Sequence, residues 1–188
     1  MTSITGKVPV RCPVCGAEHE ASVVQSINAH TEPAVKARLL AGELNVLACH
    51  CGKRTPLAAT IVFIDPAKNF YCQVVPDATS VDKAITAFRD SGAGGTQRIV
   101  RTQNELIEKI KILDANLADW GVEMLKIGID DRVVLFDRAD DAELHWVVLD
   151  RVIRGLATPR AEYVEFVQRE PPSELVIDRA WALRALPN

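Results

Sequence analysis

The chain has 188 residues, of which 48% are apolar and 25% charged, and its formal net charge is −3. This length is sufficient for one large core or two small ones, and the composition is that of an ordinary globular protein. The acidic balance lacks the basic footprint that nucleic-acid-binding domains usually carry. No apolar run approaches the ~18 residues of a membrane-spanning helix, and the N-terminal MTSITGKVPVRCP lacks the apolar stretch of a signal peptide. We therefore expect a cytoplasmic protein with no membrane partner.

The part of the chain up to residue 76 predicts a small β-rich structure interrupted by one helix. Alternating β-branched and polar residues indicate strands, whereas a proline in a first turn followed by a glycine at the end indicates a helix. The expected strands are 5–11, 19–28 and 44–48, and the expected helix is 32–41. Two further apolar runs, 57–64 and 69–75, flank the turn-like DPAK and predict a hairpin.

The middle of the chain predicts helices. Apolar residues at helical spacing indicate one helix over 80–90, and the capping-box pattern T-x-x-E at Thr102 indicates the start of another. A further helix is expected over 119–129. The GAGG run at 92–95 lacks the spacing of a phosphate-binding loop and is interpreted as a connector to a short strand, 97–101. Charged residues of the second helix are expected on its exposed face: Glu105, Glu108, Lys109 and Lys111.

The tail after residue 131 predicts mostly strands. The expected strands are VVLFD (133–137), LHWVVLDRV (144–152), EYVEFVQ (162–168) and ELVID (174–178), and WALRAL (181–186) is a short closing element. The fold class is therefore α+β. A zinc-ribbon-like N-terminal portion with a strand–helix–strand insertion is expected over 1–76, a helical segment over 77–130 and a β-rich portion over 131–188, which can pack as one domain.

Four cysteines in two short runs, CPVCG and CHCGK, carry the strongest chemical signal. In a reducing compartment, paired cysteines are typical of metal binding rather than of disulfides. Thiolate sulfur suits Zn²⁺, which takes four ligands in a tetrahedron. We predict a Cys₄ zinc site made of Cys12, Cys15, Cys49 and Cys51. Four thiolates close the shell, so the predicted role is structural, with the ion tying together the two ends of the segment between the pairs.

The second cysteine pair has only one residue between its members, and this leaves a second ligand set open. Two residues one apart in an extended chain share a face, so Cys49 and Cys51 can chelate one ion while His50 points away. The alternative set uses only one of these two cysteines, with His19, His30 or His50 as the fourth ligand.

These residues resemble the CpXC domain of bacteria and archaea. The resemblance covers about residues 8–76, through CPVCG, SINAHTEPAVKARLLAGELN, CHCG and the strand pair around FIDP. The first motif matches at Cys12, Pro13 and Cys15, whereas the second has no proline and a C-x-C spacing. The segment RTQNELIEKIKILDANLADWGVEMLKIGI is similar to the continuation found in longer members. The resemblance implies a metal-binding fold and supplies no catalytic residue.

Other residues that carry chemistry have simpler interpretations. Cys72 alternates with apolar neighbours in its predicted strand and is expected to be a small core residue. The three tryptophans, Trp120, Trp146 and Trp181, are expected in core packing. No nucleophile elbow is recognisable. A polar hairpin turn explains the remaining acidic cluster better than a cation site does: Asp130, Asp131, Asp137, Asp140 and Asp141.

A closed thiolate shell without an accompanying acid–base set favours a non-enzymatic, zinc-stabilised interaction module whose partner is another protein. One alternative is a metal-dependent enzyme in which Cys12, Cys15, one cysteine of the second pair and a water hold an open zinc. The other is nucleic-acid binding, which the net acidity disfavours. It would use the bases near the site: Arg11, Lys36, Arg38, Lys53 and Arg54. The sequence leaves the oligomeric state open.

Overall fold

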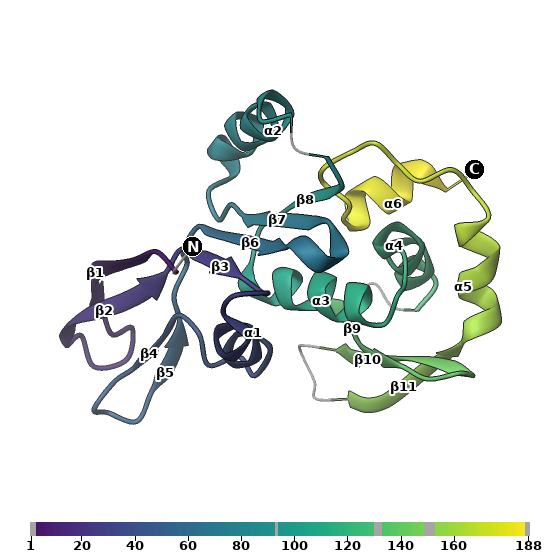
Figure 1. The fold of residues 1–188 in the computed structure, drawn as a ribbon. Coiled ribbons are helices and arrows are strands. Elements are labelled where there is room, and N and C mark those ends of the chain that lie inside the picture. The colour runs from purple at the N-terminus through teal and green to yellow at the C-terminus, as the bar shows by residue number, and fades with distance from the viewer. Residues whose placement is uncertain (1–2, 93, 130–132, 149–152, 187–188) are drawn as a thin grey trace. The chain divides into compact units, whose positions relative to one another are not determined.

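The structure is a computed structural model that describes residues 3–92, 94–129, 133–148 and 153–186. It divides into two compact units, Met1–Asn104 and Glu105–Asn188, which Figure 1 colours from purple to teal and from teal to yellow. Each unit contains both helices and strands, so the predicted α+β class is confirmed. The three portions 1–76, 77–130 and 131–188 stay a prediction. In the described part of the chain, no helix is long and apolar enough to cross a membrane.

The first unit is built on a four-stranded sheet in the order β3-β6-β7-β8. β6 and β7 form the predicted hairpin, while β3 runs parallel to β6 and β8 runs parallel to β7. Every second residue of β6 and β7 is buried, among them Phe63 and Cys72, both fully buried, which confirms Cys72 as a core residue. The strands are β3 (Ser26–Asn28), β6 (Ile61–Asp65), β7 (Phe70–Val74) and β8 (Thr96–Val100).

Two helices of the first unit confirm the sequence prediction. They are α1 (Pro33–Leu40) and α2 (Val81–Asp90), and two short 3₁₀ turns accompany them, η1 (Pro66–Lys68) and η2 (Ala78–Ser80). The GAGG run does connect α2 to β8, and one of its glycines has a steric reason. Gly95 has a φ of +92°, and a Cβ there would collide with the carbonyl oxygen of Asn69, which accepts a hydrogen bond from the Thr96 N–H at 2.9 Å.

Two further hairpins complete the first unit, and they lie side by side in Figure 1. One pairs β1 (Thr5–Arg11) with β2 (Glu18–Val24), and the other pairs β4 (Val46–Ala48) with β5 (Arg54–Pro56). The predicted strand 19–28 is therefore two strands, β2 and β3, and β5 was not predicted. These hairpins have little core of their own, because their four strands contain only two buried residues, Val23 of β2 and Leu47 of β4.

The second unit packs helices on a three-stranded antiparallel sheet in the order β11-β10-β9. Its core includes Phe136 and Trp146, whose rings meet edge to face with centroids 5.9 Å apart. Trp120 and Trp181 pack in a second cluster, so all three tryptophans are core residues as predicted. The elements are α3 (Gln103–Asp114), α4 (Asp119–Ile127), β9 (Val134–Ala139), β10 (Glu143–Val148), β11 (Ile153–Pro159), α5 (Arg160–Val167) and α6 (Arg179–Ala185).

The prediction of a strand over 162–168 is wrong, because these residues lie in the helix α5 and its end. Apolar residues that alternate along a strand can also share one face of a helix when they are four positions apart. Tyr163 and Val167 have this spacing, so they lie one helical turn apart on the same face of α5. Both side chains pack over Gly121 of α4, where an added Cβ would lie 2.6 Å from Val167 and 2.9 Å from Tyr163. Close approach to α4 thus decides the helix over the strand.

The predicted strand 174–178 is also absent, whereas the short closing element exists as α6. Ile177 is buried, and its carbonyl oxygen accepts a hydrogen bond from Lys109 at 2.8 Å rather than from a neighbouring strand. The Asp178 carboxylate caps α6 by accepting from the Trp181 N–H at 2.8 Å. Of the predicted acidic cluster, Asp130 and Asp131 lie outside the described residues. The rest belongs to the β9–β10 hairpin, with Asp140 and Asp141 in its turn.

The expectation that Glu108 and Lys109 are exposed is wrong, because both are buried, at 2% and 3% exposure. Lys109 pairs with Asp119 at 3.0 Å and with Glu123 at 3.3 Å. Lys126 Nζ forms ion pairs with Glu123 at 3.1 Å and with Glu108 at 2.8 Å. Opposite charges brought by α4 therefore allow this face of α3 to be buried.

Candidate metal centre

The loops of the two small hairpins carry the four cysteines. In the first loop, residues 12–17, the Cys12 N–H donates to the carbonyl oxygen of Ala17 at 2.8 Å and the Gly16 N–H donates to that of Cys12 at 3.0 Å. Gly16 has a φ of +73°, which a residue with a side chain adopts only with strain. We call this loop the first knuckle.

The second knuckle, residues 49–53, repeats this scheme with one residue fewer. The Cys49 N–H donates to the carbonyl oxygen of Lys53 at 2.9 Å, and the Gly52 N–H donates to that of Cys49 at 2.9 Å. Gly52, directly after the second cysteine as Gly16 is in the first knuckle, has a φ of +83°. The extended chain expected for C-x-C is therefore wrong: the pair lies in a tight turn, and the turn brings both sulfurs to one side.

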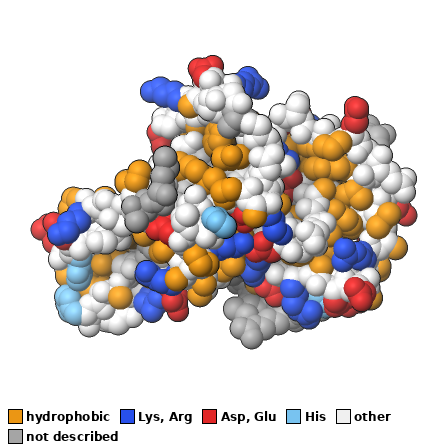
Figure 2. Space-filling model, in the orientation of Figure 1, with side chains coloured by type: hydrophobic (Ala, Val, Ile, Leu, Met, Phe, Trp, Pro, Cys, Tyr) orange, Lys and Arg blue, Asp and Glu red, His pale blue; other side chains and the backbone are white. Residues whose placement is uncertain are grey.

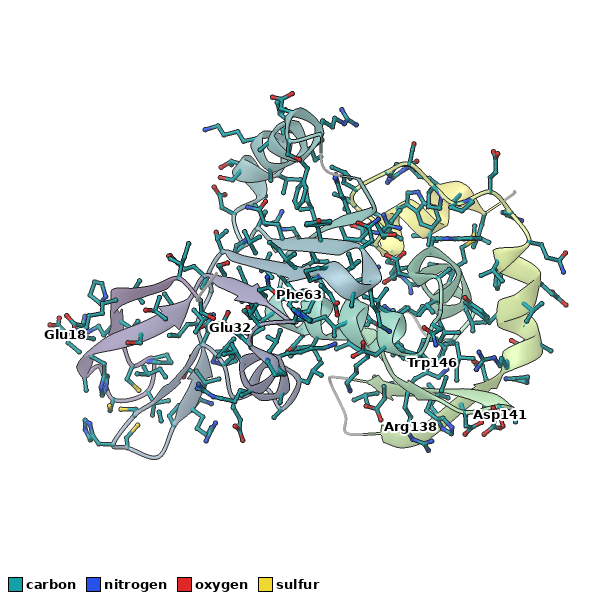
Figure 3. All side chains as sticks on the ribbon, in the orientation of Figure 1. Glu18, Glu32, Phe63, Arg138, Asp141 and Trp146 are labelled. Carbon is teal, nitrogen blue, oxygen red and sulfur yellow. The ribbon has the colours of Figure 1, made fainter. Side chains whose placement is uncertain are left out.

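The four sulfur atoms gather where the two knuckles meet, and they are the yellow sticks between the hairpin ends in Figure 3. Cys12 Sγ and Cys51 Sγ are 3.7 Å apart, and Cys15 Sγ and Cys49 Sγ are 3.5 Å apart. All four lie within 4.8 Å of one another and none forms a disulfide, whose S–S bond is about 2.05 Å. Sulfurs bound to one Zn²⁺ at ~2.3 Å in a tetrahedron lie about 3.8 Å apart. The donor set therefore fits a tetrahedral metal ion.

Burial and backbone hydrogen bonds make the four thiols unequal. Cys12 and Cys49 are buried, whereas Cys15 and Cys51 are exposed. The N–H groups of Cys15 and Val14 donate to the Cys12 sulfur and lower its pKa to about 6. The Cys51 N–H lowers the pKa of Cys49, but burial and the neighbouring thiols outweigh it and raise that pKa to about 12. Because a metal ion binds thiolates, binding to this group would release protons from its thiols.

Asn45 ties the two hairpins together away from the knuckles. Its side-chain oxygen accepts from the Val24 N–H at 2.7 Å, and its side-chain N–H donates to the Val24 carbonyl oxygen at 3.0 Å. Asn45 is buried and has a φ of +51°, a conformation that asparagine tolerates better than most residues. Since Val24 ends β2 and Asn45 precedes β4, this amide joins the hairpins at their bases, and the four cysteine sulfurs meet at their tips. The sequence pattern gave no signal for this role.

Two of the three histidines considered as alternative ligands lie at the cysteine group. His19 Nε2 is 3.2 Å from Cys49 Sγ, and His50 Nδ1 is 3.8 Å from the same sulfur. The expectation that His50 points away therefore fails, because the turn reorients it. His30 belongs to neither of the two groups of potential metal donors found among the described residues.

The charges around the knuckles are mixed in sign. Arg11 pairs in register with Glu18, the residue labelled at the outer end of β2 in Figure 3, and Lys7 forms an ion pair with Glu20 at 2.6 Å. Figure 2 shows blue and red side chains side by side over this end of the unit. On the face drawn in Figure 2, the charge at this end of the unit is therefore mixed and not uniformly basic.

Two hairpins bring four cysteine sulfurs together at their tips, and this arrangement makes the chain a protein with a candidate metal centre. The chain belongs to the CpXC family: the model of the CpXC protein family matches residues 10–126, which is more than half of the chain. The match includes both knuckles and extends through α3 into α4, so the similarity noted for the segment after residue 100 is confirmed. Comparison with curated proteins and with solved structures finds no match.

Proposed function

We propose that this CpXC protein is a non-enzymatic binding module in which Cys12, Cys15, Cys49 and Cys51 hold a structural Zn²⁺ in a zinc ribbon. The observation that supports it most is the pair of sulfur–sulfur distances, 3.5 and 3.7 Å, which are close to the edge of a zinc–thiolate tetrahedron. Four thiolates occupy every position of such an ion. Its contribution is therefore to folding and not to activation of a water.

The hairpins have a physical need for this ion. With few buried apolar residues, two-stranded hairpins are marginal in water. The cysteine pairs are far apart in the chain, so one ion closes a long loop and supplies the cross-link that a core would otherwise provide. The metal would thus hold a small, stiff surface in place.

The surface of the first knuckle supports protein binding. Val14 is 67% exposed, the most exposed of the large apolar side chains among the described residues, and the adjacent Pro13 is exposed as well. Ordering a side chain or loop at an interface costs conformational entropy. An apolar side chain on a turn that is already rigid loses little of it on binding, which favours contact with a protein. The mixed charges nearby disfavour nucleic acid, and a mobility-shift assay at low salt tests that alternative directly.

The metal part of the proposal is tested by zinc analysis of the purified chain and of Cys12→Ser. We expect zinc in the wild-type protein, its loss in the variant, and loss of hairpin structure on chelation. A chelated protein that keeps its fold and loses only a catalytic turnover would contradict a structural role.

The binding part is tested by quantitative affinity capture with wild type, Val14→Ser and, as the matched control, Val164→Ser, which changes an exposed valine of α5. A protein partner should be retained by the wild type and by Val164→Ser, and lost with Val14→Ser and after chelation. Equal capture by all forms would contradict a role for the first knuckle.

A further inference from the structure

A second group of metal-type donors lies against the cysteine group. It consists of His19 Nε2, Cys49 Sγ and His50 Nδ1, which all lie within 4.8 Å of one another. The two histidines come from different hairpins, His19 from β2 and His50 from the second knuckle, and their rings are 5.9 Å apart. Building on the proposed Cys₄ site, we propose that these three residues bind a second divalent ion of the Zn²⁺ class, with the Cys49 thiolate bridging the two ions.

The distances suit one ion between these donors. A tetrahedral Zn²⁺ with a thiolate at ~2.3 Å and an imidazole at about 2.0–2.1 Å holds sulfur and nitrogen about 3.5 Å apart. The observed separations from Cys49 Sγ, 3.2 Å for His19 and 3.8 Å for His50, lie on either side of this value. His30, the remaining histidine of this unit, belongs to neither group of donors.

Charge favours the second ion. One divalent cation in four thiolates leaves the centre with two surplus negative charges. In the β1–β2 hairpin, Lys7 Nζ is paired with Glu20 at 2.6 Å, and Arg11 Nε donates to the Gly16 carbonyl oxygen of the first knuckle at 3.0 Å, so each side chain has a partner other than the sulfurs. A second dication held by two neutral imidazoles and the bridging thiolate would balance the charge of the four sulfurs.

The second ion differs from the first in its access to solvent. Three protein donors leave the fourth position of a tetrahedral ion to water or to a small ligand, which is the arrangement of zinc ions that act as Lewis acids. His50 is exposed, and the half-buried His19 also lines a groove of about 480 Å³ with Arg11, Glu18 and Glu20. Solvent therefore reaches the histidine side of the centre, where the open position of the second ion would lie.

The competing explanation is that both imidazoles donate N–H hydrogen bonds to the Cys49 thiolate of a single-ion centre. The two explanations differ in the number of ions bound. The experiment is native mass spectrometry with metal analysis of the full chain, saturated with Zn²⁺ and passed through gel filtration. The forms compared are the wild type, His19→Ala, His50→Ala and the matched control His30→Ala.

We expect two zinc ions per chain in the wild type and in His30→Ala, and one in His19→Ala and in His50→Ala. Reconstitution with Co²⁺ should keep the intense sulfur-to-cobalt absorption in both single-ion variants, which shows that the Cys₄ site is intact and that the variants are folded. One ion in all four forms would overturn the second site and leave the Cys₄ site standing. One ion in the wild type whose Co²⁺ spectrum changes in His19→Ala would also overturn it, since His19 would then be a ligand of the single ion. A metal-free wild type would overturn both proposals.

Discussion

The cysteine hairpins of the first unit and the β9–β10 hairpin of the second unit differ in how many apolar side chains they bury. The strands of the cysteine hairpins bury only two residues, Val23 in β2 and Leu47 in β4, and none in β1 or β5. The β9–β10 hairpin of the second unit buries a row of large side chains, with Phe136 and Trp146 at 2% and 1% exposure. The β9–β10 hairpin therefore rests on an apolar core, whereas the proposed metal ion would supply the cysteine hairpins with a cross-link at their tips.

The first knuckle and the β9–β10 turn nevertheless have one feature in common: in each, an anionic side chain accepts hydrogen bonds from backbone N–H groups of the turn. In the first knuckle the Cys12 sulfur accepts from the N–H groups of Cys15 and Val14. In the β9–β10 turn the Asp140 carboxylate accepts from those of Ala142 and Glu143 at 3.0 and 2.9 Å. Both turns therefore use the same kind of hydrogen bonding. Of the two acceptors, the thiolate is the one that suits a soft metal ion.

The largest effect should come from removing the metal. Structural zinc in small domains binds with an apparent free energy of about 10–16 kcal/mol, so a chelator should unfold the cysteine hairpins. All three tryptophans belong to the second unit, so their emission should stay unchanged. Hydrogen exchange should show loss of protection over 5–24 and 46–56 and little change in β9 and β10.

The matched control for this experiment is Cys72→Ala, which removes a buried thiol of β7 that lies outside the metal group. It should lower stability through a small cavity and leave the zinc content unchanged. Protection of the hairpins that survives chelation would show that they have enough core after all, and the comparison would fail.

The reverse experiment is Trp146→Ala in β10. Removing a fully buried tryptophan should cost about 3–5 kcal/mol, since the cavity cannot close around the ring of Phe136. Urea unfolding followed through Trp120 and Trp181 should shift to lower midpoints, while the zinc content stays the same. Loss of zinc in this variant would show that the cysteine hairpins depend on the core of the second unit.

A smaller effect is expected for Gly52→Ala. An added Cβ has no atom within 4 Å, so the cost is the φ of +83° alone, about 1 kcal/mol. Zinc affinity, measured by competition with a chelating dye, should fall about fivefold. Gly128→Ala is the control, because Gly128 has a φ of −79°. Equal affinities in the two variants would mean that the second knuckle does not need its glycine.

Much of this organisation could be predicted from local sequence. Alternation in β6 and β7 predicted both the hairpin and the burial of Cys72, and Pro33 with Gly42 bounded α1. The cysteine spacing indicated which four sulfurs come together, because the knuckles are short and their ligands are set within a few residues.

What the sequence could not predict depends on contacts between distant segments. The alternation in α5 is compatible with a strand, and only close packing of Tyr163 and Val167 on Gly121 selects the helix. Lys109 has the local pattern of an exposed residue, and it is buried because Asp119 lies 3.0 Å from its ammonium. Propensity and periodicity contain no information about such partners.

The smallest expected effect concerns acid and the β9–β10 turn. The hydrogen bond from His145, at 2.7 Å, and those from the N–H groups of Glu143 and Ala142 lower the pKa of Asp140 from 3.8 to about 2. A carboxyl with a lowered folded-state pKa stabilises the fold above its ordinary pKa, and this contribution is lost as the pH falls from about 4 to 2. Asp140→Asn should therefore flatten the pH dependence of urea unfolding in that interval, followed by tryptophan emission. The effect should be small, because the Asp140 side chain is 48% exposed and solvent screens its charge. An unchanged acid dependence in the variant would mean that the carboxylate does not act in this turn as the thiolate does in the first knuckle.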